Sequence, residues 1–162
     1  MGEPGEDERD RMETAVRGVV EAVVAATGLD ATVAITPGGE EADLAASIDG
    51  EGVEVLVGRQ GETIDALQYL LTQIASRAAG PGGRRRVALD VGGYRERRAA
   101  ALRDLARRAA DEAVEYGEEI ELDPMSPHDR RIVHMELKEI ETVATRSEGD
   151  EPRRRIIVEP VD

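Results

Sequence analysis

Gly58-Arg59-Gln60-Gly61 is the stretch that decides the fold, because this loop stands between a short helical segment and a long helical pattern. The two glycines permit backbone conformations and a close approach that side chains would forbid. The helix after Gly61 is expected to point unpaired N–H groups and its positive dipole end toward the loop. Such a junction, with Arg59 in it, is suited to holding a phosphodiester backbone. The spacing alone is common in helix–helix turns, so the surrounding elements must support the hypothesis.

The elements around the loop follow from the spacing of apolar residues. A helix is predicted from Arg9 to a C-cap at Gly28, and another from the loop to Gly80. Alternation predicts strands over residues 31–36, 43–49 and 84–91, the first two as a hairpin. The inward stripe of the helix after the loop is predicted to be Ile64, Leu67, Leu70, Leu71, Ile74 and Ala78. With the short helical segment over 52–57, the order becomes α-β-β-α-α-β.

The second half of the chain has its own pattern, and Gly92-Gly93 is the predicted boundary before it. A long Arg/Ala helix is predicted over residues 94–116. Ser126 is a typical N-cap with Pro at the next position, so a helix is predicted from there to about Ile140. Short strands are predicted over residues 120–122, 142–147 and 153–159. This half is expected to form a small sheet packed on helices.

Composition limits the classes of protein to which the chain can belong. It has 162 residues, no Cys, no Trp and no Phe, so Val, Ile, Leu and Ala must fill modest cores in two modules. The lack of Cys excludes disulfides and thiolate chemistry within the sequence. No apolar run approaches the roughly 20 residues of a membrane-spanning helix, and the acidic N-terminus is unlike a secretory signal. A cytoplasmic protein without membrane insertion is therefore expected.

The net charge of −14 is an objection to nucleic-acid binding, and its distribution answers part of that objection. Residues 1–57 carry a net −11 and residues 117–162 a net −6, whereas residues 58–116 carry +3. A phosphate responds to charges within about a Debye length, roughly 8 Å at physiological salt. A basic face that begins at Gly58 is therefore compatible with the acidic total, and weak, salt-sensitive binding is predicted.

Arg130 and His134 form the second motif, Arg-x-x-x-His, and their spacing places them one turn apart on one helix face. Arg offers a planar donor fork to phosphate, and His offers a second donor or a stacking surface. Arg131 is expected to help electrostatically. Taken alone, the pair is better explained as packing against the sheet.

The motifs together resemble one family. The stretch around Gly58–Gly61 is similar to the Gly-x-x-Gly segment of the bacterial Jag proteins, also called KhpB. Residues 89–98 resemble the junction between the two domains of that family. The stretch that ends in Arg130-Arg131-Ile132-Val133-His134 resembles the Arg-x-x-x-His, or R-3-H, signature of its second domain. The resemblance spans roughly residues 10–160, and it favours a nucleic-acid contact at Arg130 and His134 over structural packing.

The resemblance implies an α+β protein in which a KH-like module precedes an R-3-H-like module. The expected divisions are a disordered acidic tail over 1–8, a type II-like KH domain over 9–92 and an R-3-H domain over 93–162. It also implies binding of RNA or single-stranded nucleic acid, association with a small KH-only partner, and a link to cell elongation and a membrane-protein insertase. Many members carry a further N-terminal domain that has no counterpart here, and Gln60 stands where a second basic residue would strengthen phosphate binding.

Little in the sequence favours catalysis. His128 and His134 are the only histidines, and their spacing of six does not share a helix face well, so no metal site is expected. No cofactor loop is present. The Arg runs at 84–86 and 153–155 are interpreted as solvated faces or edge-strand protection. Tyr69 and Tyr94 are interpreted mainly as packing residues, which favours backbone contacts and weak sequence selectivity.

The predicted function is non-catalytic binding of single-stranded RNA at Gly58, Arg59, Gln60 and Gly61, with a second contact region at Arg130, Arg131 and His134. Single-stranded DNA stays an alternative, because nothing here is a specific reader of the 2′-hydroxyl. The main rival is an adaptor that docks other proteins, which the strong acidity and the few aromatic residues support. An unrecognised nuclease is a less favoured alternative function. The oligomeric state and the target RNA are left open.

Overall fold

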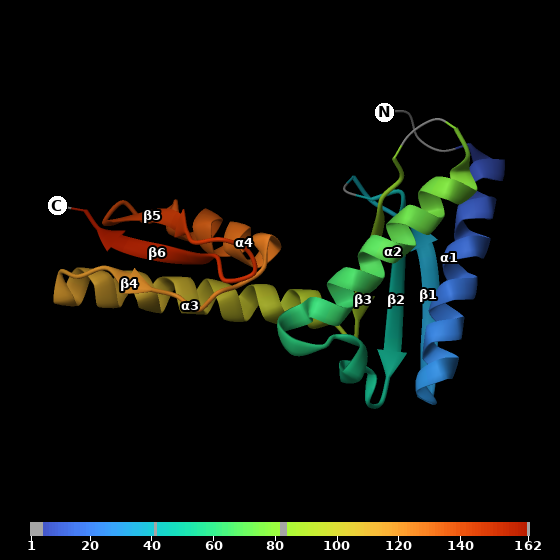
Figure 1. The fold of residues 1–162 in the computed structure, drawn as a ribbon, viewed down its shortest axis with the longest axis horizontal. Helices are drawn as coiled ribbons and strands as arrows, with labels where there is room; N and C mark the ends of the chain where they lie inside the picture. The colour runs from blue at the N-terminus through green and yellow to red at the C-terminus, as the bar shows by residue number, and fades with distance from the viewer. Residues whose placement is uncertain (1–4, 41, 82–83, 162) are drawn as a thin grey trace. The chain divides into compact units, whose positions relative to one another are not determined.

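The computed structural model describes residues 5–40, 42–81 and 84–161, and the chain divides into two compact units (Figure 1). The first unit ends at Tyr94 and the second begins at Arg95, just after the predicted boundary at Gly92-Gly93. Each unit has a hydrophobic core of its own. The mixed α+β class predicted from the sequence is confirmed.

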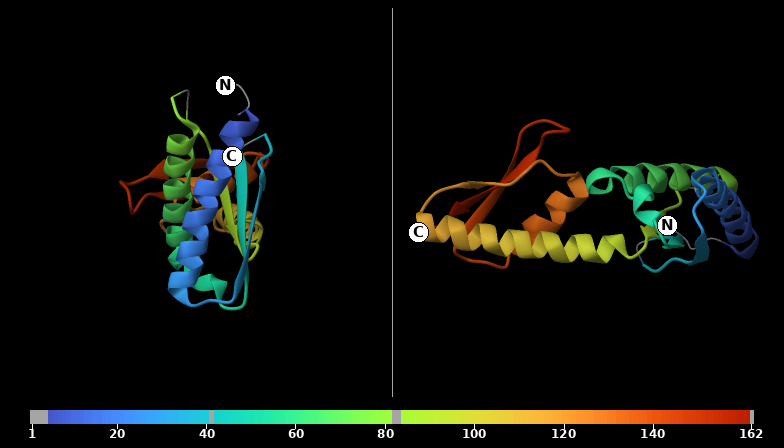
Figure 2. Two further views of the ribbon diagram at one scale, coloured as in Figure 1. Left: turned by 90° about the vertical axis from the view of Figure 1, so that its right-hand side faces the viewer. Right: turned by 90° about the horizontal axis from the view of Figure 1, so that it is seen from below.

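The first unit has the order α-β-β-α-α-β, in which the short helical pieces beside the loop are 3-10 turns. Its elements are α1 (Glu6–Thr27), β1 (Ala31–Pro37), β2 (Leu44–Gly50), η1 (Val53–Leu56), η2 (Arg59–Gly61), α2 (Glu62–Ala79) and β3 (Val87–Val91). Strand β2 lies in the middle, antiparallel to β1 and parallel to β3. Helices α1 and α2 lie side by side over one face of this sheet (Figures 1 and 2).

The core of the first unit follows from the two periodicities. Helix α1 buries a stripe at spacings of four residues, and β2 and β3 bury alternate residues, as predicted. The members are Met12, Val16, Val20 and Val24 from α1, Leu44, Ala46 and Ile48 from β2, and Val87, Leu89 and Val91 from β3. Gly28 ends α1 in the left-handed conformation with φ 67°, which confirms it as the C-cap.

Two expectations about this unit were wrong. Helix α1 begins at Glu6, so residues 6–8 belong to a helix and not to a disordered tail, while residues 1–4 lie outside the described residues. Three acidic residues in the first turn suit the positive end of the helix dipole, which favours this start. On α2 the side chain of Leu70 is 45% exposed, whereas Ala75 is buried. The helix presents a narrower face to the sheet than the predicted stripe.

Arg85 also corrects the interpretation of the run 84–86 as a solvated face. Its side chain is only 9% exposed and forms ion pairs with Glu8 of α1 at 2.8 Å and with Asp43 before β2 at 3.3 Å. The Asp43 carboxylate also accepts the backbone N–H of Arg86 at 2.7 Å. A buried guanidinium needs such partners, because an unpaired charge in a protein interior is strongly destabilising. Arg85 therefore joins α1 to the sheet.

The second unit consists of two helices and a three-stranded antiparallel sheet, as predicted. Its elements are α3 (Tyr94–Tyr116), β4 (Ile120–Glu121), α4 (Pro127–Leu137), β5 (Val143–Glu148) and β6 (Arg155–Pro160), with the sheet order β4-β6-β5. Leu102 of α3, Val133 of α4 and Val158 of β6 meet in its core. Helix α4 ends at Leu137, earlier than the predicted Ile140. In the described part of the chain, no helix combines the length and the hydropathy needed to cross a bilayer.

Candidate nucleic-acid interface

Both glycines of the Gly58–Gly61 loop have a positive φ, a backbone region that favours glycine. Gly58 has φ 73° and ψ −177°, a region almost exclusive to glycine, and Gly61 has φ 87°. Between them, Gln60 is held at φ 51° and ψ 24°, the left-handed conformation that side chains rarely adopt. Arg59 and Gln60 are both exposed at the tip. The loop thus projects two polar side chains from a backbone whose shape is fixed.

The N-terminus of α2 differs from the expectation of unpaired N–H groups aimed at a phosphate. The N–H groups of Thr63 and Ile64 both donate to the carbonyl of Val57 at 3.1 Å, and the N–H of Glu62 donates to Arg59. These bonds close the loop onto the helix, so that part of the sequence argument was wrong. A phosphate at this loop would therefore interact mainly with the exposed Arg59 side chain and the dipole of α2. Unpaired N–H groups of the helix would contribute less.

The charge at the loop is mixed. Arg59 makes no ion pair with any residue that the structure describes, so its charge is available to a ligand. Glu62 and Asp65 stand in the first turn of α2, directly after the loop. These carboxylates suit the helix dipole but repel phosphate. A binding site here is therefore expected to be weak and sensitive to salt.

Replacing Gly58 with alanine should lower the free energy of unfolding of the first unit by about 1–3 kcal/mol from backbone strain alone. A Cβ at this position would lie 2.1 Å from the hydroxyl oxygen of Thr63, which adds a steric clash. Gly18→Ala is the matched control, because Gly18 lies inside α1 with open space around its Cβ position. That change should stabilise by roughly 0.5–1 kcal/mol. Urea unfolding measures both, and equal effects of the two changes would contradict the described loop geometry.

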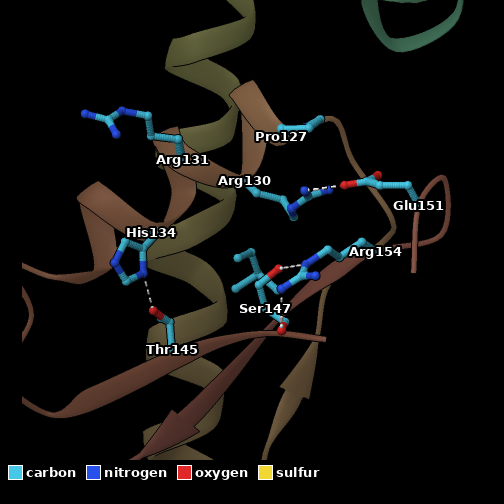
Figure 3. A pocket seen from close by; sticks show the side chains of 9 residues that line it. Pro127, Arg130, Arg131, His134, Thr145, Ser147, Glu151 and Arg154 are labelled. Carbon is cyan, nitrogen blue, oxygen red and sulfur yellow. Dashed lines mark hydrogen bonds and ion pairs between the residues drawn. The ribbon is translucent and has the colours of Figure 1, made fainter. Parts of the chain in front are cut away.

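The second candidate region is a pocket of about 530 Å³ in the second unit (Figure 3). It is lined by Pro127, Arg130, Arg131, His134, Thr145, Ser147, Glu151, Arg154 and Ile156. The three residues predicted here, Arg130, Arg131 and His134, all belong to it. Helix α4 supplies them, and β5, β6 and the turn between these strands supply the other wall (Figure 3).

The guanidinium of Arg130 already has hydrogen-bond and ion-pair partners inside the protein. Its Nη1 donates to the carbonyl of Met125 at 2.7 Å, and its Nη2 pairs with Oε1 of Glu151 at 2.5 Å. The side chain is only 11% exposed. Arg130 therefore has the structural contacts that the alternative interpretation of the motif predicts, although it also lines the pocket.

His134 and Arg131 are more open than Arg130. His134 is exposed, and its Nδ1 lies 2.6 Å from the hydroxyl of Thr145 on β5, which orients the ring. Arg131 is exposed, makes no ion pair within the described residues, and points away from the other labelled side chains (Figure 3). The pocket therefore combines one oriented imidazole with one exposed cation.

Sequence reasoning missed Thr145, Ser147, Glu151 and Arg154. Thr145 and Ser147 stand two apart on β5 and so share one face of the sheet. Nε of Arg154 donates to Oγ of Ser147 at 2.8 Å, and Nη2 donates to the Ser147 carbonyl at 3.3 Å. The alternation along β5 could have predicted that Thr145 and Ser147 share one face of the sheet. Nothing local showed that this face meets α4.

The start of α4 is held by capping and by a buried ion pair. Oγ of Ser126 accepts the N–H of Asp129, which confirms the predicted N-cap. The Asp129 carboxylate is buried and accepts two hydrogen bonds from Arg98 of α3, at 3.0 and 2.8 Å. These contacts fix the first turn of α4 and therefore the positions of the arginines that follow.

A second charged cluster, outside the pocket lining, joins Arg146 of β5 to Glu119 just before β4. Arg146 donates to Glu119 at 3.2 and 2.8 Å, and these hydrogen bonds hold the carboxyl pKa of Glu119 below its ordinary value and raise the pKa of Arg146. A lowered acid pKa stabilises the fold above the ordinary value, and that stabilisation is lost as the pH falls through the lowered one. The pair is exposed, so its contribution is small.

The two candidate aromatic residues, Tyr94 and Tyr69, differ in their exposure to solvent. Tyr94 packs against the core of the first unit, and its ring lies where a Cβ on Gly61 would stand, so its packing role is confirmed. Tyr69 is 67% exposed, so the packing role assigned to it was wrong.

Within the described ranges, no three His, Cys, Asp or Glu side chains gather as a metal site requires.

Comparison with known proteins assigns both units. The profile of the KhpA/KhpB KH domain matches residues 13–89, and the profile of the R-3-H domain matches residues 100–160. This chain belongs to the KhpB family. The Gly58–Gly61 loop lies inside the KH match, and Arg130 and His134 lie inside the R-3-H match.

Relatives named RNA-binding protein KhpB support the assignment. The protein of Lactiplantibacillus plantarum is 39% identical over 149 residues, which cover 90% of this chain and 45% of the relative. That of Clostridium symbiosum is 36% identical over 118 residues, covering 73% and 52%. That of Bacillus subtilis is 33% identical over 113 residues, covering 68% and 53%. The chain therefore spans about half the length of the KhpB proteins that it matches.

Proposed function

We propose that this protein binds single-stranded RNA without catalysis, through the Gly58–Gly61 loop of its KH domain and the pocket of its R-3-H domain. The observation that carries the proposal is the pocket, where residues from α4 and from the β5–β6 hairpin bring Arg130, Arg131, His134 and Arg154 around one cavity in a chain of net charge −14. The name shared by the relatives, RNA-binding protein, supports the same chemistry.

The loop and the pocket have complementary roles in this proposal. The exposed Arg59 would contact backbone phosphate beside the N-terminus of α2. The pocket would contact a second stretch of backbone through Arg131 and the open edge of His134. Because few aromatic residues are present, base stacking contributes little and sequence selectivity should be weak.

Titration of a labelled oligouridine strand at low salt, followed by fluorescence anisotropy, tests the proposal. Binding should weaken steeply as salt rises, with a slope of about 0.7 in log K per phosphate contacted. A double-stranded RNA of the same length should bind less well, because it does not present an isolated flexible backbone to the loop. Saturable binding is expected for the single strand. No binding to either form at low salt would overturn the proposal.

An adaptor that docks other proteins is the second candidate, and the exposed side chains of Val55, Tyr69 and Leu70 favour it. Capture of partners with and without RNase separates the two functions. Partners lost after RNase support RNA-mediated association, and partners retained support direct docking. The small KH-only partner and the cytoplasmic location stay predictions in either case.

A further inference from the structure

We propose that Arg154, which lies outside the Arg-x-x-x-His motif, makes the main phosphate contact of the R-3-H pocket, and that Arg130 acts as a positioning residue. The inference rests on the proposed function, since it names the residue through which this pocket holds a nucleic-acid phosphate. Three features of the pocket carry it: the pairing of Arg130, the pairing of Arg154, and the open edge of His134.

Arg130 has little left to offer a ligand. One side of its guanidinium bonds the Met125 carbonyl at 2.7 Å, and the other pairs with Glu151 at 2.5 Å. The Glu151 carboxylate neutralises its charge and already accepts from the Nη2 group that would otherwise donate to a phosphate oxygen (Figure 3). Because Met125 precedes α4 and Glu151 lies between β5 and β6, Arg130 ties the two walls of the pocket together. Its low exposure, 11%, agrees with that role.

Arg154 has the opposite pattern of contacts. Its two bonds go to the hydroxyl and the carbonyl of Ser147, which are neutral acceptors, at 2.8 and 3.3 Å. Among the residues that the structure describes, no carboxylate pairs with Arg154, so its positive charge is not neutralised. A guanidinium has five N–H donors. Arg154 lines the pocket, and its donors that do not bond Ser147 have no partner among the described residues. Ser147 also holds the group in one orientation, which lowers the entropy lost on binding.

The wall of the pocket opposite Arg154, which carries His134, also suits a phosphate ligand. His134 lies across the pocket from Arg154, with Nδ1 directed to Thr145 (Figure 3). Its Nε2 has no hydrogen-bond partner among the described residues. An imidazole edge and an unneutralised guanidinium on facing walls fit an anionic group with several acceptor oxygens, which is the phosphodiester of a single strand. A neutral ligand would leave the charge of Arg154 without compensation.

Three single substitutions in the full chain test the assignment by anisotropy with labelled oligouridine across a salt series. Arg154→Gln should weaken binding by about tenfold, the loss of one charge-assisted contact, and should reduce the salt slope by about 0.7. Arg153→Gln is the matched control, because the neighbouring Arg153 is exposed, lies outside the pocket lining and makes no ion pair within the described ranges. It should change affinity by less than about twofold and leave the slope unaltered.

Arg130→Gln separates positioning from direct contact. It should lower the unfolding temperature of the second unit while it leaves the salt slope close to that of the unsubstituted protein. A slope reduced by Arg130→Gln and not by Arg154→Gln would overturn the assignment, as would equal effects of Arg154→Gln and Arg153→Gln. If the unsubstituted protein fails to bind the strand, the proposed function itself is wrong, so the two failures are distinguishable.

Discussion

Replacing Arg85 with alanine should lower the free energy of unfolding of the KH unit by about 3–5 kcal/mol, the range for breaking a buried ion pair by removing one partner. The guanidinium bridges Glu8 at 2.8 Å and Asp43 at 3.3 Å, and its side chain is 9% exposed. Its removal leaves the partly buried carboxylates of Glu8 and Asp43 without the cation that they share, so the destabilisation includes the cost of leaving both charges without this partner. Backbone hydrogen exchange of β2 and β3 in the full chain measures the loss within this unit.

Arg86→Ala is the matched control, since Arg86 is adjacent and exposed, and among the described residues its side chain bonds only the backbone carbonyl of Glu40. A surface change of this kind should alter the free energy of unfolding by no more than about 0.5 kcal/mol. Similar protection in the two variants would show that Arg85 is solvated, as the sequence alone had indicated. The exchange rates of the R-3-H unit serve as an internal reference, because that unit has a separate core.

Replacing Arg59 and Gln60 together with aspartate should weaken the binding of single-stranded RNA by more than about tenfold, which corresponds to at least 1.4 kcal/mol. The change removes the cation that projects from the loop and adds two anions beside Glu62 and Asp65. Both replaced side chains are exposed, and aspartate tolerates the left-handed backbone of Gln60, so the fold should be retained. Anisotropy with oligouridine at low salt measures the affinity.

A control with the same change in charge is available on the same helix. The double substitution Gln73→Asp and Arg77→Asp makes the same change in charge near the other end of α2. Arg77 lies about 22 Å along the helix from Glu62. When the two variants are compared at physiological salt, this variant should keep most of the affinity, because that distance exceeds two Debye lengths of roughly 8 Å. Equal losses in the two variants would mean that only the net charge of the protein matters. The loop would then have no specific role.

Local patterns accounted for the elements, and long-range contacts accounted for most of the errors. The helical period of Met12, Val16 and Val20 and the alternation of Leu44, Ala46 and Ile48 sufficed to predict α1 and β2, because each period reflects one buried face. Leu70 was misplaced because the width of a buried stripe depends on what packs against the helix. The pattern of one helix does not contain that information.

The sequence by itself determined the order α-β-β-α-α-β, the glycine loop before α2, and the capped helix that carries Arg130 and His134. These features depend on neighbours within a few residues, where propensity, capping and periodicity act. Only the tertiary structure decided which charges are available. Arg85 pairs with Glu8 at a separation of 77 residues along the chain, and Arg130 pairs with Glu151 at a separation of 21. The reason is physical: such an ion pair depends on distance in space, and the fold alone sets that distance.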